Sequence, residues 1–216
     1  MALVCHMLRY ALNAYESATV FYTASGDSIP LVGAELLADP WRQLGIPQGT
    51  PVTGISAKER APDMPIFEAS RRAALCRAEL PPMPARCYGS QWVMLSREHA
   101  GMVVMSGTLN CEKLKGIYKE TLARPTDGHT NLHARFHPEE EYIPYILHVL
   151  NQVPWPTEFR EIMAEEFTDK SFCTLCKYRA GHARILDERG EQRLKRKLER
   201  EQRVRLFMRK VSPLAV

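Results

Sequence analysis

Two cysteines separated by two residues form the clearest candidate for chemistry in this sequence. Cys173 and Cys176, in the segment FCTLCKYRAGHAR, have the spacing of a zinc knuckle, in which two thiolates bind one metal ion. A structural zinc ion takes four ligands, so this motif is half of a site. His182 completes a C-x2-C-x5-H spacing and is the third candidate ligand. The fourth would come from a partner chain or from a distant cysteine of this chain, namely Cys76, Cys87 or Cys111.

Two other interpretations of the same cysteine pair remain open. A redox pair would need the motif at the N-terminus of a helix beside a βαβ unit, and the surrounding sequence predicts no such unit. Alternatively, both thiols pack as ordinary interior side chains, which is the interpretation that the sequence favours. No secretory signal accompanies the scattered cysteines, so a reducing compartment is expected. No cofactor is therefore certain, and zinc is the metal to test.

Three histidines at intervals of four residues are a second candidate metal site. His129, His133 and His137 would share one face of a helix, and histidines with this spacing can bind a metal. Gly128 and Pro138 flank them closely, however, and no glutamate occupies the H-E-x-x-H position. We therefore expect these histidines to lie in a loop or on the surface.

Sequence motifs for catalysis are missing. The chain has no glycine-rich phosphate loop, no G-x-S-x-G nucleophile turn and no pair of catalytic carboxylates. The segment GIPQGTPVTG at residues 45–54 contains glycines, but its prolines lack the N–H donors of a phosphate cradle. We expect a protein that is not an enzyme and has no small-molecule substrate.

The basic C-terminal segment is the strongest functional signal. The 216-residue chain carries 29 Lys and Arg against 25 Asp and Glu, a net charge of +4. Residues 177–210 hold thirteen Lys and Arg but only five Asp and Glu, a local net charge of +8, so the rest of the chain has a net charge of −4. This asymmetry indicates a body that packs on protein and a terminal segment that binds a polyanion.

Arginine predominates in this segment, which favours RNA or DNA phosphates as the polyanion. The alternative is a solvated helix with internal ion pairs, since Glu191–Lys195 and Glu201–Arg205 have i, i+4 spacing. The positive excess is larger than such pairs can neutralise. The candidate RNA-binding residues are Lys177, Arg179, Arg184, Arg193, Lys195, Arg196, Lys197, Arg200, Arg203, Arg205, Arg209 and Lys210.

The hydrophobic pattern predicts an α+β fold with a small core, a β-hairpin, several helices and an extended basic C-terminal helix. Residues 1–24 indicate a helix followed by a strand at TVFY. The apolar face of this helix (Leu3, Met7, Tyr10 and Ala14) suggests either docking on the core, which we favour, or an organelle presequence. QWVML and GMVVM, which flank SREHA, predict a hairpin over residues 91–105 with both faces covered.

Helices are expected to follow this hairpin. Asn110 would cap a helix that reaches residue 123, and a helix over residues 138–152 would restart or kink at Pro144. The next would span residues 154–167, with Thr157 as its cap. Its buried stripe would be Phe159, Ile162, Met163 and Phe167. A long solvated helix is expected from Ile185 to Met208.

The chain is expected to divide into a mixed α+β body, residues 1–176, and a basic helical arm, residues 177–216. Within the body, residues 30–87 form an irregular, proline-rich segment with a short helix from Phe67 to Leu80. A loop of this length is uncommon unless it is functional or held by a partner. No segment reaches the ~18 apolar residues that a membrane-spanning helix needs.

In overall style, the proline-rich loops of residues 30–66 and the basic residues 177–210 resemble accessory ribosomal proteins. The start MLRYALNAY points to mitochondrial ribosomes, and FCTLCKYR is similar to zinc-bearing cysteine pairs of organellar ribosomal proteins. The resemblance implies a non-catalytic α+β subunit of the mitochondrial matrix that packs against neighbouring proteins and lays its C-terminal helix on rRNA. An alternative is a protein-only accessory or assembly subunit of a mitochondrial membrane complex, respiratory or ATP synthase. A third hypothesis is a metal-dependent enzyme that uses Cys173, Cys176 and the histidines.

Overall fold

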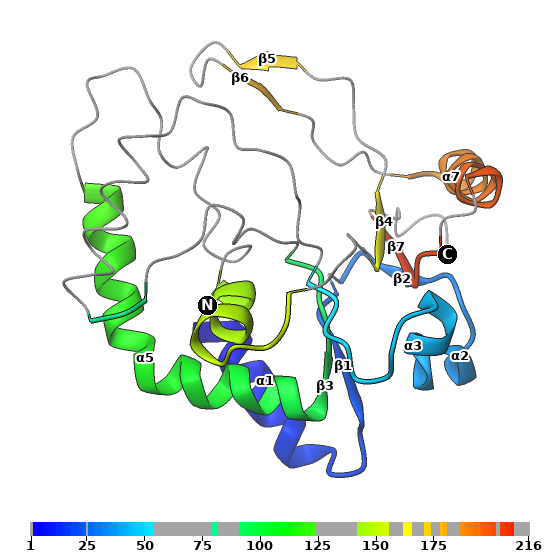
Figure 1. Ribbon diagram of the computed structural model, residues 1–216. Helices are drawn as coiled ribbons and strands as arrows, with labels where there is room; N and C mark the ends of the chain where they lie inside the picture. Colours follow the sequence, from blue (N-terminus) through cyan, green and yellow to red (C-terminus); the bar gives the residue numbers. More distant parts are fainter. Residues whose placement is uncertain are drawn as a thin grey trace.

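A computed structural model confirms the α+β class (Figure 1). It describes residues 2–24, 26–53, 79–81, 91–123, 142–155, 162–165, 171–173, 178–180, 186–201 and 204–209. Its helices are α1 (Ala2–Ala14), α2 (Ala34–Ala38), α3 (Pro40–Leu44), α5 (Arg97–Ala123), the π-helix η2 (Tyr145–Leu150) and α7 (Glu188–Arg200). Its strands are β1 (Val20–Tyr22), β2 (Ile29–Pro30), β3 (Met94–Ser96), β4 (Met163–Glu165), β5 (Ser171–Cys173), β6 (Tyr178–Ala180) and β7 (Phe207–Arg209).

The strands pair between segments that are far apart in the sequence. β1 pairs antiparallel with β3, so that Phe21 lies opposite Leu95. β7 lies between β2, to which it is antiparallel, and β4, to which it is parallel. The C-terminal strand is therefore the middle strand of its sheet. β5 and β6 form a local antiparallel hairpin.

One core cluster forms where α1 packs against α5 and η2. Cys5 and Leu8 of α1 are buried there together with Val103 of α5. Gly107 lets the elements approach closely, because a Cβ at this position would collide with the Tyr142 hydroxyl. The expectation that α1 docks on the core thus agrees with the structure.

The face through which α1 docks is not the predicted one. Leu3, Met7 and Tyr10, which share the apolar face seen in the sequence, are exposed. Cys5 and Leu8 on the other side are buried instead, and the Cys5 thiol packs beside Gly107, where α5 has no Cβ. An exposed apolar ridge therefore remains on α1.

The hairpin predicted over residues 91–105 is wrong in its second half. Residues 94–96 form β3, as expected for QWVML, but residues 101–105 lie within α5. Val103 is fully buried whereas Met105 is exposed, so α5 buries one helical face and not both faces of a strand. Short apolar runs have no decisive period, and here packing against α1 outweighs the β preference of the two valines.

The helix start predicted at Asn110 is also wrong, because the residues before it are already helical. Asn110 lies inside α5, and its side-chain amide donates a hydrogen bond to the Ser106 carbonyl at 2.9 Å. The N-terminus of α5 is instead capped by Ser96, whose Oγ accepts a hydrogen bond from the His99 N–H at 3.2 Å. One long helix replaces a strand and a shorter helix.

The helix predicted over residues 154–167 is wrong at its described positions 162–165. Met163–Glu165 form β4, which pairs with β7, and both Ile162 and Met163 are buried. Thr157, Phe159 and Phe167 lie outside the described residues. A strand forms because β7 offers backbone partners that the local sequence does not reveal.

The last helix is shorter than predicted. α7 ends at Arg200, and residues 207–209 form β7 rather than the end of a solvated helix reaching Met208. Leu206 and Met208 are fully buried. These apolar side chains follow the charged run and draw the chain back into the core.

Other expected elements are described only in part. Residues 142–144 form a helical turn, and Pro144 immediately precedes the π-helix η2, in keeping with the expected restart there. Of the irregular segment 30–87, the structure describes residues 30–53, which contain α2 and α3, and residues 79–81. Of the helix predicted from Phe67 to Leu80, the structure describes only residues 79 and 80.

Among the described helices, none has the length and apolarity to cross a membrane.

The π-helix buries a histidine. His148 is 5% exposed, its Nδ1 lies 2.9 Å from the Val153 carbonyl oxygen, and its Nε2 has no hydrogen-bond partner among the described residues. Burial lowers the pKa of His148, and the nearby His99 lowers it further. The imidazole is therefore held neutral in the folded protein.

We expect the folded state to lose stability on acidification from pH 7.5 to 5.5. A histidine with a lowered pKa stabilises the fold fully above about pH 6.5, and this contribution is lost as the pH falls towards the lowered value. The free energy of unfolding should fall by up to about 1.4 kcal/mol per pH unit for this group. Urea denaturation at several pH values measures the slope. H148F should reduce the slope, leaving the part contributed by His99, whose pKa is also lowered by burial, whereas H6Q, at an exposed histidine, should not change it; an unchanged slope in H148F would contradict the assignment.

Candidate nucleic-acid interface

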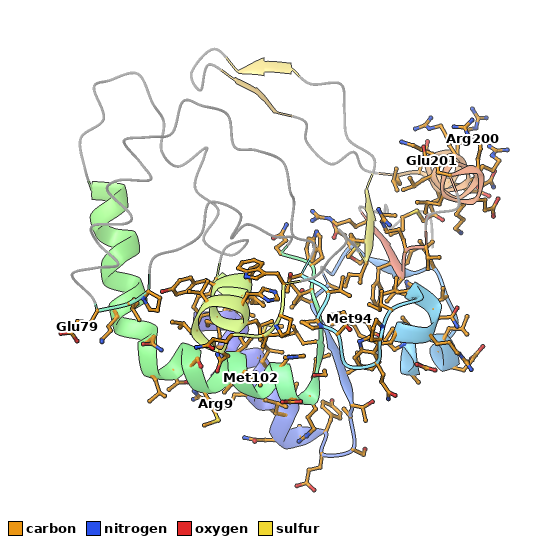
Figure 2. All side chains as sticks on the ribbon, viewed as in Figure 1. Arg9, Glu79, Met94, Met102, Arg200 and Glu201 are labelled. Carbon is orange, nitrogen blue, oxygen red and sulfur yellow. The ribbon has the colours of Figure 1, made fainter. Side chains whose placement is uncertain are left out.

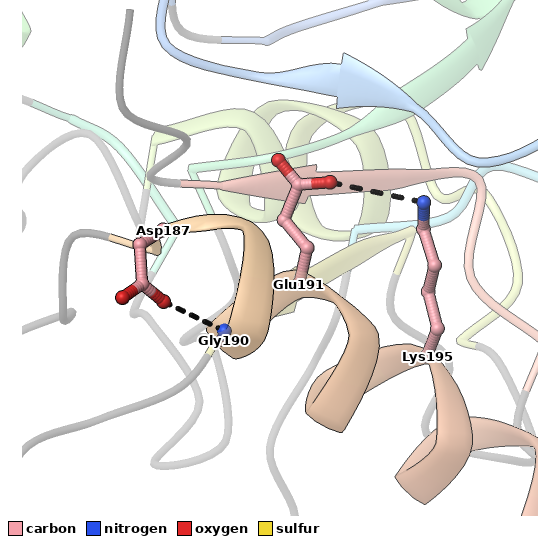
Figure 3. Close-up of polar contacts among 4 residues, drawn as sticks. All are labelled: Asp187, Gly190, Glu191 and Lys195. Atoms are coloured by element: carbon pink, nitrogen blue, oxygen red, sulfur yellow. Dashed lines mark hydrogen bonds and ion pairs between the residues drawn. The ribbon is translucent and has the colours of Figure 1, made fainter. Parts of the chain in front are cut away.

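α7 is a well-capped helix whose charges follow its dipole. Asp187 is the N-cap, and its carboxylate accepts a hydrogen bond from the Gly190 N–H at 2.8 Å (Figure 3). Glu188 and Glu191 lie in the first turn, and Lys197 and Arg200 in the last. Acidic residues stabilise the positive N-terminal end of a helix and basic residues its C-terminal end. Local sequence therefore suffices to specify this helix.

A narrow apolar stripe fixes the orientation of α7. Gly190 and Leu194 are buried, and Leu198 is half-buried. Leu194 packs in a cluster with Ala164 of β4 and Met208 of β7. α7 thus packs on the sheet in which β7 is the middle strand, and one side of α7 is turned away from the body (Figure 1).

Four arginines gather on the outward side of α7. Arg189, Arg193, Arg196 and Arg200 are all exposed, and their spacing of four, three and four residues places them within an arc of about 60°. We call these four residues the arginine ridge. It extends about 16 Å along the helix axis. Figure 2 shows the side chains of α7, Arg200 among them, projecting from the edge of the molecule.

The ridge includes one residue that the sequence analysis missed. Arg189 stands on the same face as Arg193 and Arg196 but was not among the predicted RNA-binding residues. Its position four residues before Arg193 is the signal that could have identified it.

The other predicted RNA-binding residues of α7 lie beside the ridge. The Lys195 ammonium is 3.8 Å from a Glu191 carboxylate oxygen, so part of its charge is balanced locally (Figure 3). Lys197 is exposed. The ion pair predicted between Glu191 and Lys195 is thus present, on a flank of α7 beside the ridge.

Two predicted residues beyond α7, Arg205 and Arg209, are half-buried. Arg209 is half-buried, and its guanidinium lies over the Trp92 ring, 4.5 Å from the centroid. Arg205 is half-buried, and its guanidinium donates a hydrogen bond to the Val204 carbonyl. The backbone of Arg179 lies in β6. Lys177, Arg184, Arg203 and Lys210 lie outside the described residues.

The cysteine pair falls at a hairpin. Cys173 ends β5, its backbone pairs with Tyr178 of β6, and Cys176 lies in the connection, outside the described residues along with His182. This is not the helix N-terminus that a thioredoxin-like redox pair would occupy. His129, His133 and His137 also lie outside the described residues, and within the described part of the chain no cluster of His, Cys, Asp and Glu could hold a metal ion.

Protein-family models and curated sequences give no relative of this chain. No protein-family model matches the chain, and no curated sequence shows significant similarity to it.

Proposed function

We propose that this protein is a non-catalytic structural component of a large ribonucleoprotein and that the arginine ridge of α7 binds RNA phosphates. The observation that supports the proposal is the gathering of Arg189, Arg193, Arg196 and Arg200 on the exposed face of a helix anchored by its opposite face. With the overall resemblance to accessory ribosomal proteins, we propose the mitochondrial ribosome, in the matrix, as the assembly.

The chemistry of the ridge suits phosphate better than a protein carboxylate surface. Guanidinium groups bind carboxylates and phosphates alike in a bidentate manner, so the preference comes from their arrangement: a row of four along about 16 Å of helix matches the regularly spaced charges of a phosphate backbone and contacts it without reading bases. Such binding releases counterions and is therefore steeply salt-dependent and tolerant of sequence. The acidic remainder of the chain would face neighbouring proteins.

Neutralising the ridge is expected to weaken RNA binding. In R189Q/R196Q/R200Q each lost phosphate contact should reduce the slope of log K against log[salt] by about 0.7, a total of about 2 for single-stranded RNA. Affinity measured over 50–300 mM salt gives this slope. The three positions are exposed, so the circular-dichroism spectrum and unfolding midpoint should be retained.

A variant with the same charge change elsewhere is the matched control. R9Q/R42Q/K113Q removes three exposed cations of α1, α3 and α5, whose surface ion pairs contribute little to stability. This variant should retain the parental salt slope. Equal slopes for the two triple variants would mean that net charge, and not the ridge, governs binding.

A protein-only assembly role is the second candidate, and the apolar ridge of α1 favours it. Leu3, Met7 and Tyr10 expose apolar surface of the kind that marks contacts with other proteins. Purification from native lysate with and without nuclease separates the two functions. Partners lost after nuclease treatment support the ribonucleoprotein, and partners retained support the protein-only assembly.

A further inference from the structure

A pocket lies at the N-terminus of α5, on residues other than the arginine ridge. Its volume is about 610 Å³, within the range of small-molecule sites. Residues 47–51, residues 96–99 and residues 153–155 line it, together with Thr19 and Trp41. Prolines 47, 51 and 154 stiffen its walls, because a proline ring fixes the backbone φ. The pocket is therefore largely preformed.

Trp155 is held in this pocket as an aromatic platform. Its indole is stacked on the His148 imidazole, with 4.5 Å between ring centroids and an interplanar angle of 24°. His148 is itself fixed by the contact between its Nδ1 and the Val153 carbonyl. One face of the indole is covered in this way, yet Trp155 remains 38% exposed. Because Trp155 also lines the pocket, part of its indole is accessible from the pocket.

Polar groups accompany the indole. Gln48 and Glu98 are exposed lining residues, and the Ser96 hydroxyl also lines the pocket, 2.9 Å from Nδ1 of His99. An amide both donates and accepts hydrogen bonds, whereas a carboxylate only accepts them. An aromatic face with donors and acceptors around it matches a nucleobase, which has a flat π surface and a polar edge. A proline-rich peptide would use the aromatic wall but not this polar rim.

We propose that this pocket binds one unpaired nucleobase, stacked on Trp155 and read at its edge by Gln48 and Glu98. The inference rests on the proposed function for the source of the base, a single-stranded segment of RNA. When the C4 substituent of a pyrimidine faces Glu98, cytosine presents an amino donor to the carboxylate, whereas uracil presents a carbonyl oxygen that the carboxylate repels. The pocket therefore prefers bases with an amino group at this position. Cytidine and uridine are matched in size and differ at C4 and at N3, so they measure the preference at this edge of the base.

Nucleosides test the pocket without phosphates. Titration of the full chain with cytidine or adenosine, followed by the backbone amide NMR signals of Gly49 and His99, which line the pocket and are present in every variant, should give saturable binding with a Kd of roughly 1 mM. W155A should weaken this binding about 5- to 150-fold, the effect of removing a base–aromatic stack. W155F retains a ring and should lose less. Uridine should bind at least about tenfold more weakly than cytidine, and E98Q should abolish that difference.

Measurements with nucleosides and with RNA distinguish the pocket proposal from the proposal that the arginine ridge binds RNA phosphates. R189Q/R196Q/R200Q should bind nucleosides as the parent does, and W155A should keep the salt slope for RNA. Absence of nucleoside binding to the parent protein would overturn the pocket proposal and leave the ridge proposal standing. Binding of a proline-rich peptide at Trp155 without any nucleoside binding would also overturn it, and would identify the pocket as a peptide site. Nucleoside binding that W155A and W155F leave unchanged would place the base elsewhere.

Discussion

Removal of residues 202–216 is expected to unfold the protein and not merely to delete a detachable arm. β7 lies between β2 and β4, and the Leu206 N–H donates a hydrogen bond to the Ile162 carbonyl at 2.9 Å. Truncation removes Leu206 and Met208, each 0% exposed. Emptying one such site costs about 2–5 kcal/mol, and a whole domain is stable by only about 5–15 kcal/mol. Loss of the cooperative urea transition is the expected measurement.

Point variants show whether the loss of stability on truncation comes from the removal of buried side chains. M208A should lower the free energy of unfolding by about 2–5 kcal/mol. V204A, at a side chain that is 46% exposed just before β7, should change it by less than about 1 kcal/mol. A truncated chain that unfolds at the parental urea concentration would contradict the central place of β7. The same geometry means that deleting residues 186–216 cannot localise RNA binding, so substitutions on the arginine ridge are the sharper experiment.

Substitution of Arg97 is expected to have the second large effect, a loss of about 2–4 kcal/mol in R97M. Its guanidinium donates hydrogen bonds to the carbonyl oxygens of Leu12 at 2.7 Å, Tyr15 at 2.9 Å and Ala18 at 3.3 Å. Two of these carbonyls lie at or just beyond the C-terminal turn of α1, where helix carbonyls lack intrahelical partners and a cation is favourable. Arg97 therefore ties the first residue of α5 to the end of α1. Urea denaturation and amide exchange in α1 measure the loss.

R97K and R9M are the controls for this prediction. Lysine keeps the charge but lacks the planar set of donors, so R97K should be intermediate. Arg9 is exposed and contacts Thr108 through a side-chain hydrogen bond, so R9M should cost less than about 1 kcal/mol. If R97M were as stable as R9M, the three carbonyl contacts would contribute nothing to the fold.

The local sequence predicted an element correctly where its hydrophobic pattern and its capping residues indicate the same type of element. α1, β1 and β3 were expected at their observed positions, and α7 begins three residues after its predicted start because Asp187 caps it. The segments GMVVM, residues 162–165 and residues 207–208 were assigned to the wrong type of element. Each contains a short apolar run that suits either a helix or a strand. The choice was made by a partner distant in sequence, which is α1 for the first run and the β4–β7 pair for the other two.

The sequence by itself determined the charge asymmetry, the capped helix α7 and the spacing of its arginines, because these depend on residues a few positions apart. Only the tertiary structure decided which side of α7 is exposed, since that follows from Leu194 packing against β4 and β7. It also decided that Arg209 faces Trp92 and that His148 supports Trp155 beside the first turn of α5. Contacts of this kind form when distant segments bury apolar surface together, and no local pattern in the chain records which segments will meet.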